Sequence, residues 1–243
     1  ANVQIFNYSP APVCLTWLGF DAPYITDKHY FLCDWNTHPA GREQHYREKL
    51  IRLPETSVAI SGLSSHQVNR NIIRKQLGID ADKLVYLCVA PGRKTNFEMI
   101  EAQVKIMKAV PDSLMIRKGQ GDHLLIREMY HQACEEQGVD FARILFIGLT
   151  KTEEEHRAIY QVVDVLLDSY PYNGGTHNLE ALWSNLPILT RAGEQYLSRM
   201  GYAFLQAVHL DQGIAWSWEE YTEIGIKLGR DANLRTQIRE HLI

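Results

Sequence analysis

From about residue 66 onward, short apolar runs alternate regularly with amphipathic segments, and this alternation limits the folds open to the chain. The run at 84–89 is apolar throughout, as expected for a strand buried on both faces of a parallel sheet. Strands that alternate with helices form right-handed βαβ units, so the pattern predicts an α/β fold with a Rossmann-like, doubly wound parallel sheet. We expect strands over 84–89, 113–116, 144–147, 164–168 and 187–190, and helices over 68–77, 97–110, 124–137, 153–162, 177–184, 216–229 and 232–242.

The first sixty residues read as the end of a separate α/β unit. A small, polar stretch at 60–65 is typical of a linker and divides the chain into 1–64 and 65–243. The chain starts at Ala1 without a methionine, already in strand-like sequence, so we expect a piece of a longer protein or a processed one. In this first part we expect strands over 13–18 and 30–34 and a short helix over 45–49.

Composition argues against several classes of protein. The net charge is −4 and no run of like charge stands out, so nothing indicates a nucleic-acid partner. No apolar stretch reaches about 18 residues and no signal segment opens the chain, so we expect no membrane partner. The cysteines are scattered without metal-binding spacing, which favours buried free thiols in a reducing compartment, the cytoplasm. They are Cys14, Cys33, Cys88 and Cys134.

Ligands of open α/β sheets bind beyond the carboxyl ends of the strands, so the loops there are where chemistry is expected. The most informative loop follows Asp168 and enters a helix through Gly174, Gly175 and Thr176. The two glycines let backbone N–H groups approach an anion, and the helix N-terminus adds oriented donors. The Thr176 hydroxyl can cap the helix or donate to a phosphate, and Glu180 can accept hydrogen bonds from ribose hydroxyls. A plain glycine turn with a threonine cap and an exposed glutamate is the alternative.

Two further strand ends offer candidate side chains. Lys94 lies at the start of the helix that follows 84–89, where its charge can neutralise a diphosphate. Thr152 and Glu155 form a capping box that places His156 in the first turn of the next helix, facing the same edge of the sheet. A solvated surface lysine and an exposed histidine are the corresponding alternatives.

The remaining polar positions near strand ends indicate structure rather than chemistry. Gly193 permits a close approach, and Glu194 is expected to start a helix. The chain has no P-loop, no dinucleotide-binding fingerprint and no nucleophile elbow. Because it also lacks a carboxylate cluster for a metal, diphosphate charge must be met by Lys94, loop amides and hydroxyls. The positions that we interpret as structural are Asp164, Asp168, Ser198 and Arg199.

Taken together, these loops resemble the C-terminal half of the family-41 glycosyltransferases, the O-linked N-acetylglucosamine transferases. The likeness covers nearly the whole chain and is most specific between residues 167 and 187. The segments that carry it are 11–20, 48–54, Leu167-Asp168 through Asn173-Gly174, Leu182-Trp183, Pro187, Gly193-Glu194 and Ser198-Arg199.

The resemblance implies a two-lobed fold of the GT-B type, with 1–64 closing the N-terminal catalytic lobe and 65–243 forming a C-terminal, UDP-sugar-binding lobe. It implies inverting transfer of a sugar, N-acetylglucosamine in the family, from a UDP-sugar donor to Ser or Thr hydroxyls of a protein acceptor, with no metal and no cofactor. Lys94 falls on the lysine that stabilises the departing UDP, which is the catalytic role. The positions implied to bind the nucleotide are His156, Asn173, Gly174, Gly175, Thr176, His177 and Glu180.

The chain also departs from the family pattern. Gly175 and His177 stand where the family has a histidine and a threonine, 20–24 lacks the usual Gly-Thr-rich turn, and 90–93 replaces an Asn-rich loop. Most of the acceptor-binding lobe and the tetratricopeptide repeats are missing, so this chain alone is expected to be inactive. A non-catalytic nucleotide-sugar-binding module, a retaining glycosyltransferase or UDP-sugar epimerase of similar fold, and a structural domain stay open as alternatives. No oligomeric state is indicated.

Overall fold

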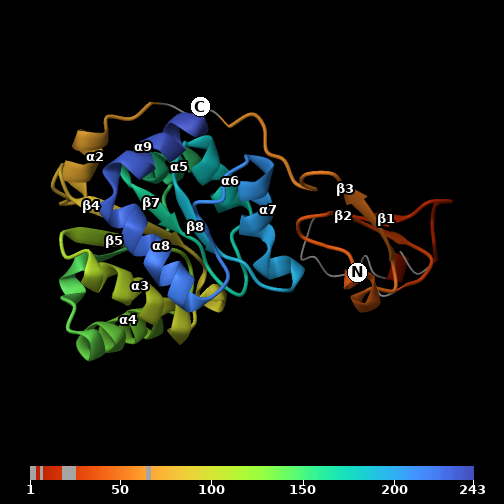
Figure 1. The fold of residues 1–243 in the computed structure, drawn as a ribbon, viewed down its shortest axis with the longest axis horizontal. Coiled ribbons are helices and arrows are strands. Elements are labelled where there is room, and N and C mark those ends of the chain that lie inside the picture. Colours follow the sequence, from red (N-terminus) through yellow and green to blue (C-terminus); the bar gives the residue numbers. More distant parts are fainter. Residues whose placement is uncertain (1–3, 6–7, 18–25, 64–66) are drawn as a thin grey trace.

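The computed structural model describes residues 4–5, 8–17, 26–63 and 67–243, which form two separate parallel sheets (Figure 1). The smaller sheet has the order β1-β2-β3, and the larger has the order β6-β5-β4-β7-β8-β9. The strands are β1 (Leu15–Thr16), β2 (Tyr30–Asp34), β3 (Lys49–Leu53), β4 (Leu84–Val89), β5 (Ser113–Lys118), β6 (Ile144–Ile147), β7 (Val165–Leu167), β8 (Ile188–Arg191) and β9 (Ile214–Ala215).

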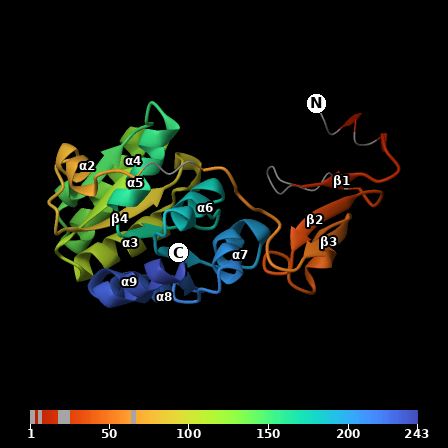
Figure 2. The ribbon, with the colours of Figure 1, turned by 90° about the horizontal axis from the view of Figure 1, so that it is seen from above.

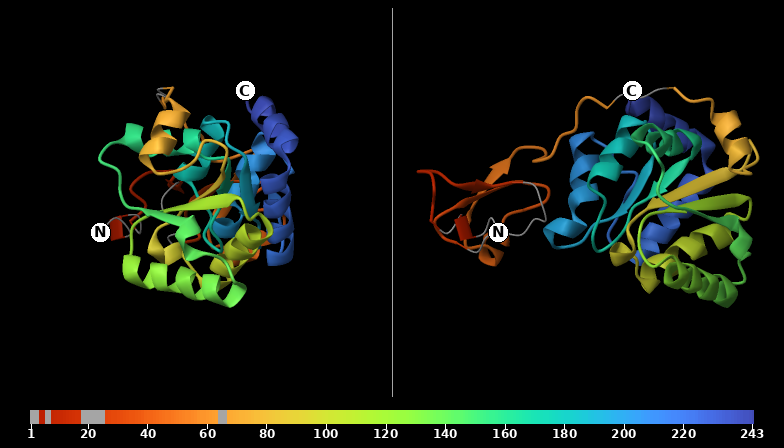
Figure 3. Two further views of the ribbon diagram at one scale, coloured as in Figure 1. Left: turned by 90° about the vertical axis from the view of Figure 1, so that its left-hand side faces the viewer. Right: turned by 180° about the vertical axis from the view of Figure 1, so that it is seen from behind.

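Helices cover both faces of the larger sheet (Figure 3). On one face α3 (Phe97–Ala109) packs against α4 (His123–Gln137) and α8 (Trp218–Arg230), and α8 also contacts α9 (Ala232–His241). The other face carries α2 (Arg70–Gln76), α5 (Glu153–Val162), α6 (Thr176–Trp183) and α7 (Met200–Ala207). On this face α2 packs against α5, α5 against α6, and α6 against α7. Short 3-10 helices are η1 (Arg42–His45), η2 (Gly92–Lys94), η3 (Phe141–Arg143) and η4 (Tyr196–Ser198). The expected α/β, doubly wound sheet is confirmed.

The strand order fixes where a ligand can enter the larger sheet. The chain steps outward from β4 to β5 and β6, then returns to place β7 on the other side of β4. The direction of winding therefore reverses between β4 and β7. In sheets of this kind the crevice for ligands opens at the reversal, beyond the carboxyl ends of the strands. The loops after β4 and β7 both lie at this point.

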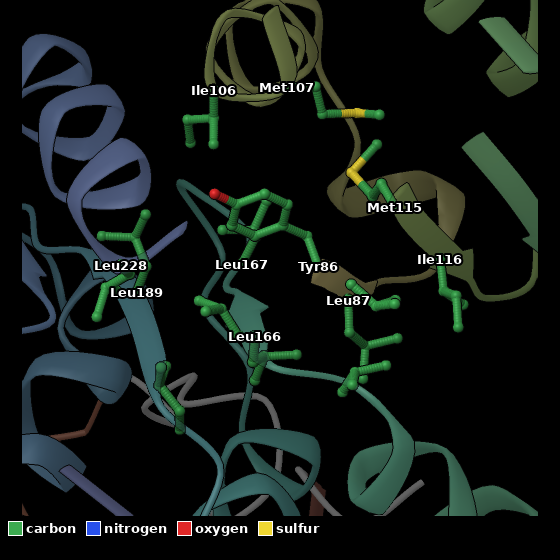
Figure 4. Close-up of a cluster of buried hydrophobic side chains, with 14 of the residues drawn as sticks. Tyr86, Leu87, Ile106, Met107, Met115, Ile116, Leu166, Leu167, Leu189 and Leu228 are labelled. Carbon is green, nitrogen blue, oxygen red and sulfur yellow. The ribbon is translucent and has the colours of Figure 1, made fainter. Parts of the chain in front are cut away.

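Two glycines let α8 approach the core closely. Figure 4 shows Tyr86 of β4 pointing toward Ile106 of α3 and Leu228 of α8. The Tyr86 hydroxyl donates a hydrogen bond to the Gly225 carbonyl at 2.8 Å. A side chain on Gly225 would collide with Ile106, and one on Gly229 would collide with the Tyr86 hydroxyl. Because these glycines lie one turn apart on one helical face, α8 can seal the core against β4 and α3.

Several expectations for the connections were wrong. The helix expected over 45–49 is instead η1 followed by β3, because Lys49–Leu53 pairs in parallel with the whole of β2. Glu194 does not start a helix, since η4 begins at Tyr196 and α7 at Met200. Neither α7 nor β9 was expected. The expected strand at 13–18 is reduced to β1; residues 18–25, which include the loop at 20–24, and linker residues 64–65 lie outside the described part of the chain.

The smaller sheet meets the larger part of the molecule beside α7 (Figure 2). Arg199, at the start of α7, donates from Nε to the Asn36 carbonyl at 2.7 Å. α2 lies on the side of the larger part that faces away from the smaller sheet (Figure 1). The division into 1–64 and 65–243 stays a prediction.

The carboxylate of Asp168 holds the loop that follows β7. Its Oδ1 accepts hydrogen bonds from the Gly174 and Ser169 amides at 2.7 and 2.8 Å. Its Oδ2 accepts from the Asn178 side chain at 2.8 Å and the Thr190 hydroxyl at 2.7 Å. Asp168 is only 1% exposed, and this burial raises its pKa to about 6, although the hydrogen bonds act in the opposite direction. The structural interpretation of Asp168 is confirmed.

Asp164, just before β7, anchors α2 to the sheet. Its carboxylate oxygens lie 2.6 Å from Arg70 and 2.8 Å from Arg74. The Arg74 side chain is 1% exposed and also donates to the carbonyls of Val162 and Lys83, both at 2.8 Å. Asp164 therefore has the structural role that the sequence indicated.

Replacing the buried partner of Asp164 should cost far more stability than replacing the exposed one. We expect Arg74→Met to lower the free energy of unfolding by about 3–5 kcal/mol, because it removes the buried ion pair with Asp164 and the hydrogen bonds from Arg74 to the Val162 and Lys83 carbonyls. The matched Arg70→Met variant, at a site about a third exposed, should lose about 1 kcal/mol or less. Urea denaturation of the three proteins measures both changes. Equal losses would contradict this account of the anchor.

The burial of Asp168 should appear in the pH dependence of stability. Its pKa is raised from 3.8 to about 6, so the folded chain favours the protonated form. The resulting stabilisation is complete below about pH 4 and is lost as the pH rises through 6, a change of about 3 kcal/mol. Urea denaturation between pH 4 and 8 should therefore show wild type losing free energy of unfolding relative to Asp168→Asn up to about pH 6, and none beyond. A difference that grows in favour of wild type with rising pH would disprove this.

Candidate functional site

Lys94 lies at the point where the winding of the sheet reverses. It is the last residue of η2, directly after β4, and is only 8% exposed. Its Nζ donates a hydrogen bond to the Asn173 carbonyl at 2.8 Å and lies 3.6 Å from the centre of the Tyr172 ring. This contact joins the loop after β4 to the loop after β7. An ammonium group is thereby held at the carboxyl edge of the sheet.

The loop after β7 is held by buried hydrogen bonds on one side and is open to a ligand on the other. Asn173 is fully buried, and its side-chain amide donates to the carbonyls of Ser169 and Arg191. The helix α6 begins at Thr176, with Gly175 as its N-cap and no side chain capping it. Of the two roles predicted for the Thr176 hydroxyl, capping is therefore wrong, and donation to a phosphate stays a prediction. The Asn178 amide already donates to the Gly175 carbonyl at 3.1 Å, whereas the amides of Thr176 and His177 donate to no group in the described part of the chain and remain available to an anion.

A cavity of about 420 Å³ opens in front of this loop. Four of the expected site residues line it, namely Lys94, Gly175, Thr176 and His177. Asn173 and Gly174 are buried and do not line it. The other lining residues are Val58, Pro91, Arg93, Tyr172, Leu179, Tyr196 and Met200.

His177 contributes a neutral ring to the cavity. Burial lowers its pKa to about 3, and the nearby charges of Lys94 and His156 act in the same direction. Its Nε2 is buried and has no hydrogen-bond partner among the described residues. At neutral pH His177 therefore adds no positive charge to the cavity.

His156 and Glu180 form a second group, separate from the cavity. His156 Nε2 lies 3.1 Å from Glu180 Oε2, and the Tyr160 hydroxyl donates to the same oxygen at 3.2 Å. The Thr152 hydroxyl accepts from the Glu155 amide and caps α5, which confirms one half of the predicted capping box, but the Glu155 carboxylate accepts from the Lys151 amide instead of from Thr152. In the described part of the chain no hydrogen bond reaches Glu180 Oε1. Glu180 follows Thr176 on α6, so one helix carries members of both groups.

Some site residues escaped the sequence reasoning. Arg93 precedes Lys94 and lines the same cavity. Tyr160 lies four residues after His156 on α5, a spacing that places both on one face of the helix. Lys118 ends β5 two residues beyond the expected strand and is buried; burial lowers its pKa and the charge of Glu180 opposes this shift. Position at a strand end was the available signal for Lys118.

Other expectations concern metals, membranes and thiols. Among the described residues, no group of three His, Cys, Asp or Glu side chains could hold a metal ion. None of the described helices is long and apolar enough to cross a membrane. All four cysteines are free and buried, so the expectation of buried free thiols is confirmed.

Known relatives share most of this chain. It is 25% identical over 251 residues to "Probable UDP-N-acetylglucosamine--peptide N-acetylglucosaminyltransferase SPINDLY" of Solanum lycopersicum, covering 95% of this chain and 25% of that protein. It is 29% identical to the SEC protein of Arabidopsis thaliana, which carries the same enzyme name, covering 94% of this chain and 24% of the relative. The chain thus spans about a quarter of the length of these relatives.

Solved structures and a family model give the same result. A mutant of the Thermobaculum terrenum O-GlcNAc transferase matches with a TM-score of 0.83 and 26% identity, covering 98% of this chain and 44% of that one. Anabaena HepE in complex with UDP and glucose shares the fold, with a TM-score of 0.54 and 17% identity over 71% of this chain and 46% of that one. The sequence model described as glycosyl transferase family 41 matches residues 59–243. This match takes in most of the chain and every residue of the cavity except Val58, so the chain belongs to glycosyl transferase family 41.

Proposed function

We propose that this chain is the donor-binding part of an enzyme that moves a sugar from a UDP-sugar to Ser or Thr hydroxyls of a protein. The observation that carries the proposal is the meeting of Lys94 with the loop before α6, at the reversal point of a family-41 chain. The relatives' names support N-acetylglucosamine as the sugar and a peptide as the acceptor. The free, buried thiols support a cytoplasmic location.

The diphosphate of the donor would lie in the cavity between Lys94 and the start of α6. A helix N-terminus carries about half a positive charge, and its unpaired N–H groups point toward an anion. Gly175 lets an anion approach this backbone closely, because glycine has no side chain of its own. Thr176 can add its hydroxyl, and Asn173 and Gly174 hold the loop in shape from behind.

The nucleoside would extend toward the second group of residues. Glu180 Oε1 would accept hydrogen bonds from the ribose, since Oε2 is already engaged by His156 and Tyr160. His156 fixes the direction of this carboxylate and can itself contact the nucleotide. The two groups are then the two ends of one binding site, joined by α6.

The chemistry would be inverting and independent of metal. The acceptor hydroxyl attacks the anomeric carbon from the side opposite the diphosphate and releases its proton to solvent, and the bond from that carbon to the phosphate oxygen breaks. Its electron pair leaves with UDP, and Lys94 stabilises the charge that develops there. Lys94 can do this without a metal because its ammonium is already held at the cavity wall by the Asn173 carbonyl.

Removing the ammonium of Lys94 should weaken UDP binding with EDTA present. We expect Lys94→Met to raise the Kd for UDP by about tenfold to a hundredfold, because one buried charge-assisted contact is lost. Calorimetric titration of the chain measures this, with Lys108→Met as the control because Lys108 is an exposed lysine near the far end of α3. Binding that disappears with EDTA would contradict metal independence. Equal affinity in wild type and Lys94→Met would contradict the placement of the diphosphate.

Neutralising Glu180 should weaken binding of the nucleoside and leave binding of the phosphates unchanged. We expect Glu180→Gln to raise the Kd for UDP by about tenfold and to leave that for inorganic pyrophosphate unchanged, because a carboxylate accepts ribose hydrogen bonds more strongly than an amide. Glu128→Gln, at an exposed position of α4, is the matched control. If both ligands weaken alike in Glu180→Gln, Glu180 shapes the loop and does not bind the ribose.

A further inference from the structure

Lys94 alone does not supply enough positive charge in the cavity to balance the negative charge of a nucleoside diphosphate. Each phosphoryl group of a UDP-sugar carries a negative charge, and the departing UDP gains another. Against these the cavity presents the ammonium of Lys94 and about half a charge from the start of α6. His177 is neutral at pH 7, because burial lowers its pKa to about 3. These two sources together carry less positive charge than the diphosphate carries negative charge.

Arg93 is the other cation among the residues that line the cavity. Its side chain is exposed at the mouth, whereas its neighbour Lys94 is buried in the wall. Within the described part of the chain, the Arg93 guanidinium makes no hydrogen bond and no ion pair. A planar guanidinium can hold two phosphate oxygens at once, which an ammonium cannot do.

The backbone beneath Arg93 is firmly held even though its side chain is not. The Gly92 amide donates to the Gln120 carbonyl, and the Lys94 amide donates to the Pro91 carbonyl at 2.9 Å. Gly92 also packs closely against Gly121, where an added Cβ would lie 3.2 Å from the Gly121 α-carbon. Arg93 therefore combines a firmly held backbone with a long, exposed side chain that lines the cavity.

We propose that Arg93 is the second binding cation of the donor site, whose guanidinium closes over the outer phosphoryl group of the nucleoside diphosphate that Lys94 holds from below. This inference rests on the function proposed above. Arg93 acts on the phosphoryl group that bears the sugar, so it contributes to donor binding and to stabilising the leaving group. Lys94 and Arg93 would then grip the diphosphate from two sides.

Phosphate number provides the test. We expect Arg93→Met to raise the Kd for UDP by about tenfold while the Kd for UMP, which lacks the outer phosphoryl group, changes by less than about twofold. Arg93→Lys keeps the charge but not the planar fork that holds two oxygens, so it should recover only part of the UDP affinity. Calorimetric titration of the chain with EDTA present measures both Arg93 variants, with Lys108→Met as the control for loss of one positive charge.

The outcomes separate this inference from the proposed function. If Lys94→Met weakens UDP and Arg93→Met does not, the donor site stands and the role of Arg93 is overturned. If Arg93→Met weakens UDP and UMP equally, or Lys108→Met has the same effect, Arg93 acts through general charge and the inference is likewise overturned. If wild type binds no UDP at millimolar concentration, the proposed function and the inference both fall.

Discussion

A carboxylate buried without a salt bridge is tolerated only where several donors converge on it, and the end of β7 is built around this constraint. Asp168 gathers donors from its own loop, from α6 and from β8. Gly201 of α7 also packs there, because a side chain at that position would collide with the carboxylate and with Thr190. The direction of α6, and with it the N–H groups that face the cavity, follows from satisfying this single group. The loop that surrounds the buried Asp168 carboxylate thus also forms the wall of the anion site. The Gly174 amide donates to Asp168, whereas Gly175 lines the cavity.

The parts of the fold that the sequence predicted are those with local causes. The strand at 84–89 and the helix at 97–110 appear nearly as expected, because a continuous apolar run and a capping residue are visible in a few neighbouring positions. α2 starts at Arg70 and not at 68 because Asn69 caps it. The strands β3 and β9 have no such local cause. They exist because they pair with β2 and β8, and β9 in particular is only two residues long.

The candidate site divides in the same way. Loops at the carboxyl ends of parallel strands must meet at one edge, so Lys94 and the Gly174-Gly175 loop could be brought together from sequence alone. Which side chains share a cavity depends on their directions and on packing between distant segments. That is why the separation of His156 and Glu180 from the cavity was not foreseen. Val58 could not be assigned to the cavity either, since nothing near it in sequence indicates that the segment after β3 passes over the site.

That segment gives the cavity a composite wall. One side belongs to the larger sheet and its loops, while Val58 comes from the strap of chain that leaves the smaller sheet. Across the same seam, Arg199 reaches the Asn36 carbonyl. A molecule in the cavity would therefore contact both the loops of the larger sheet and the segment that leaves the smaller sheet, and would link the two parts. Part of its binding free energy would be used to hold the smaller sheet against the larger part. The affinity for the ligand and the stability of the contact between the two parts would therefore be thermodynamically coupled.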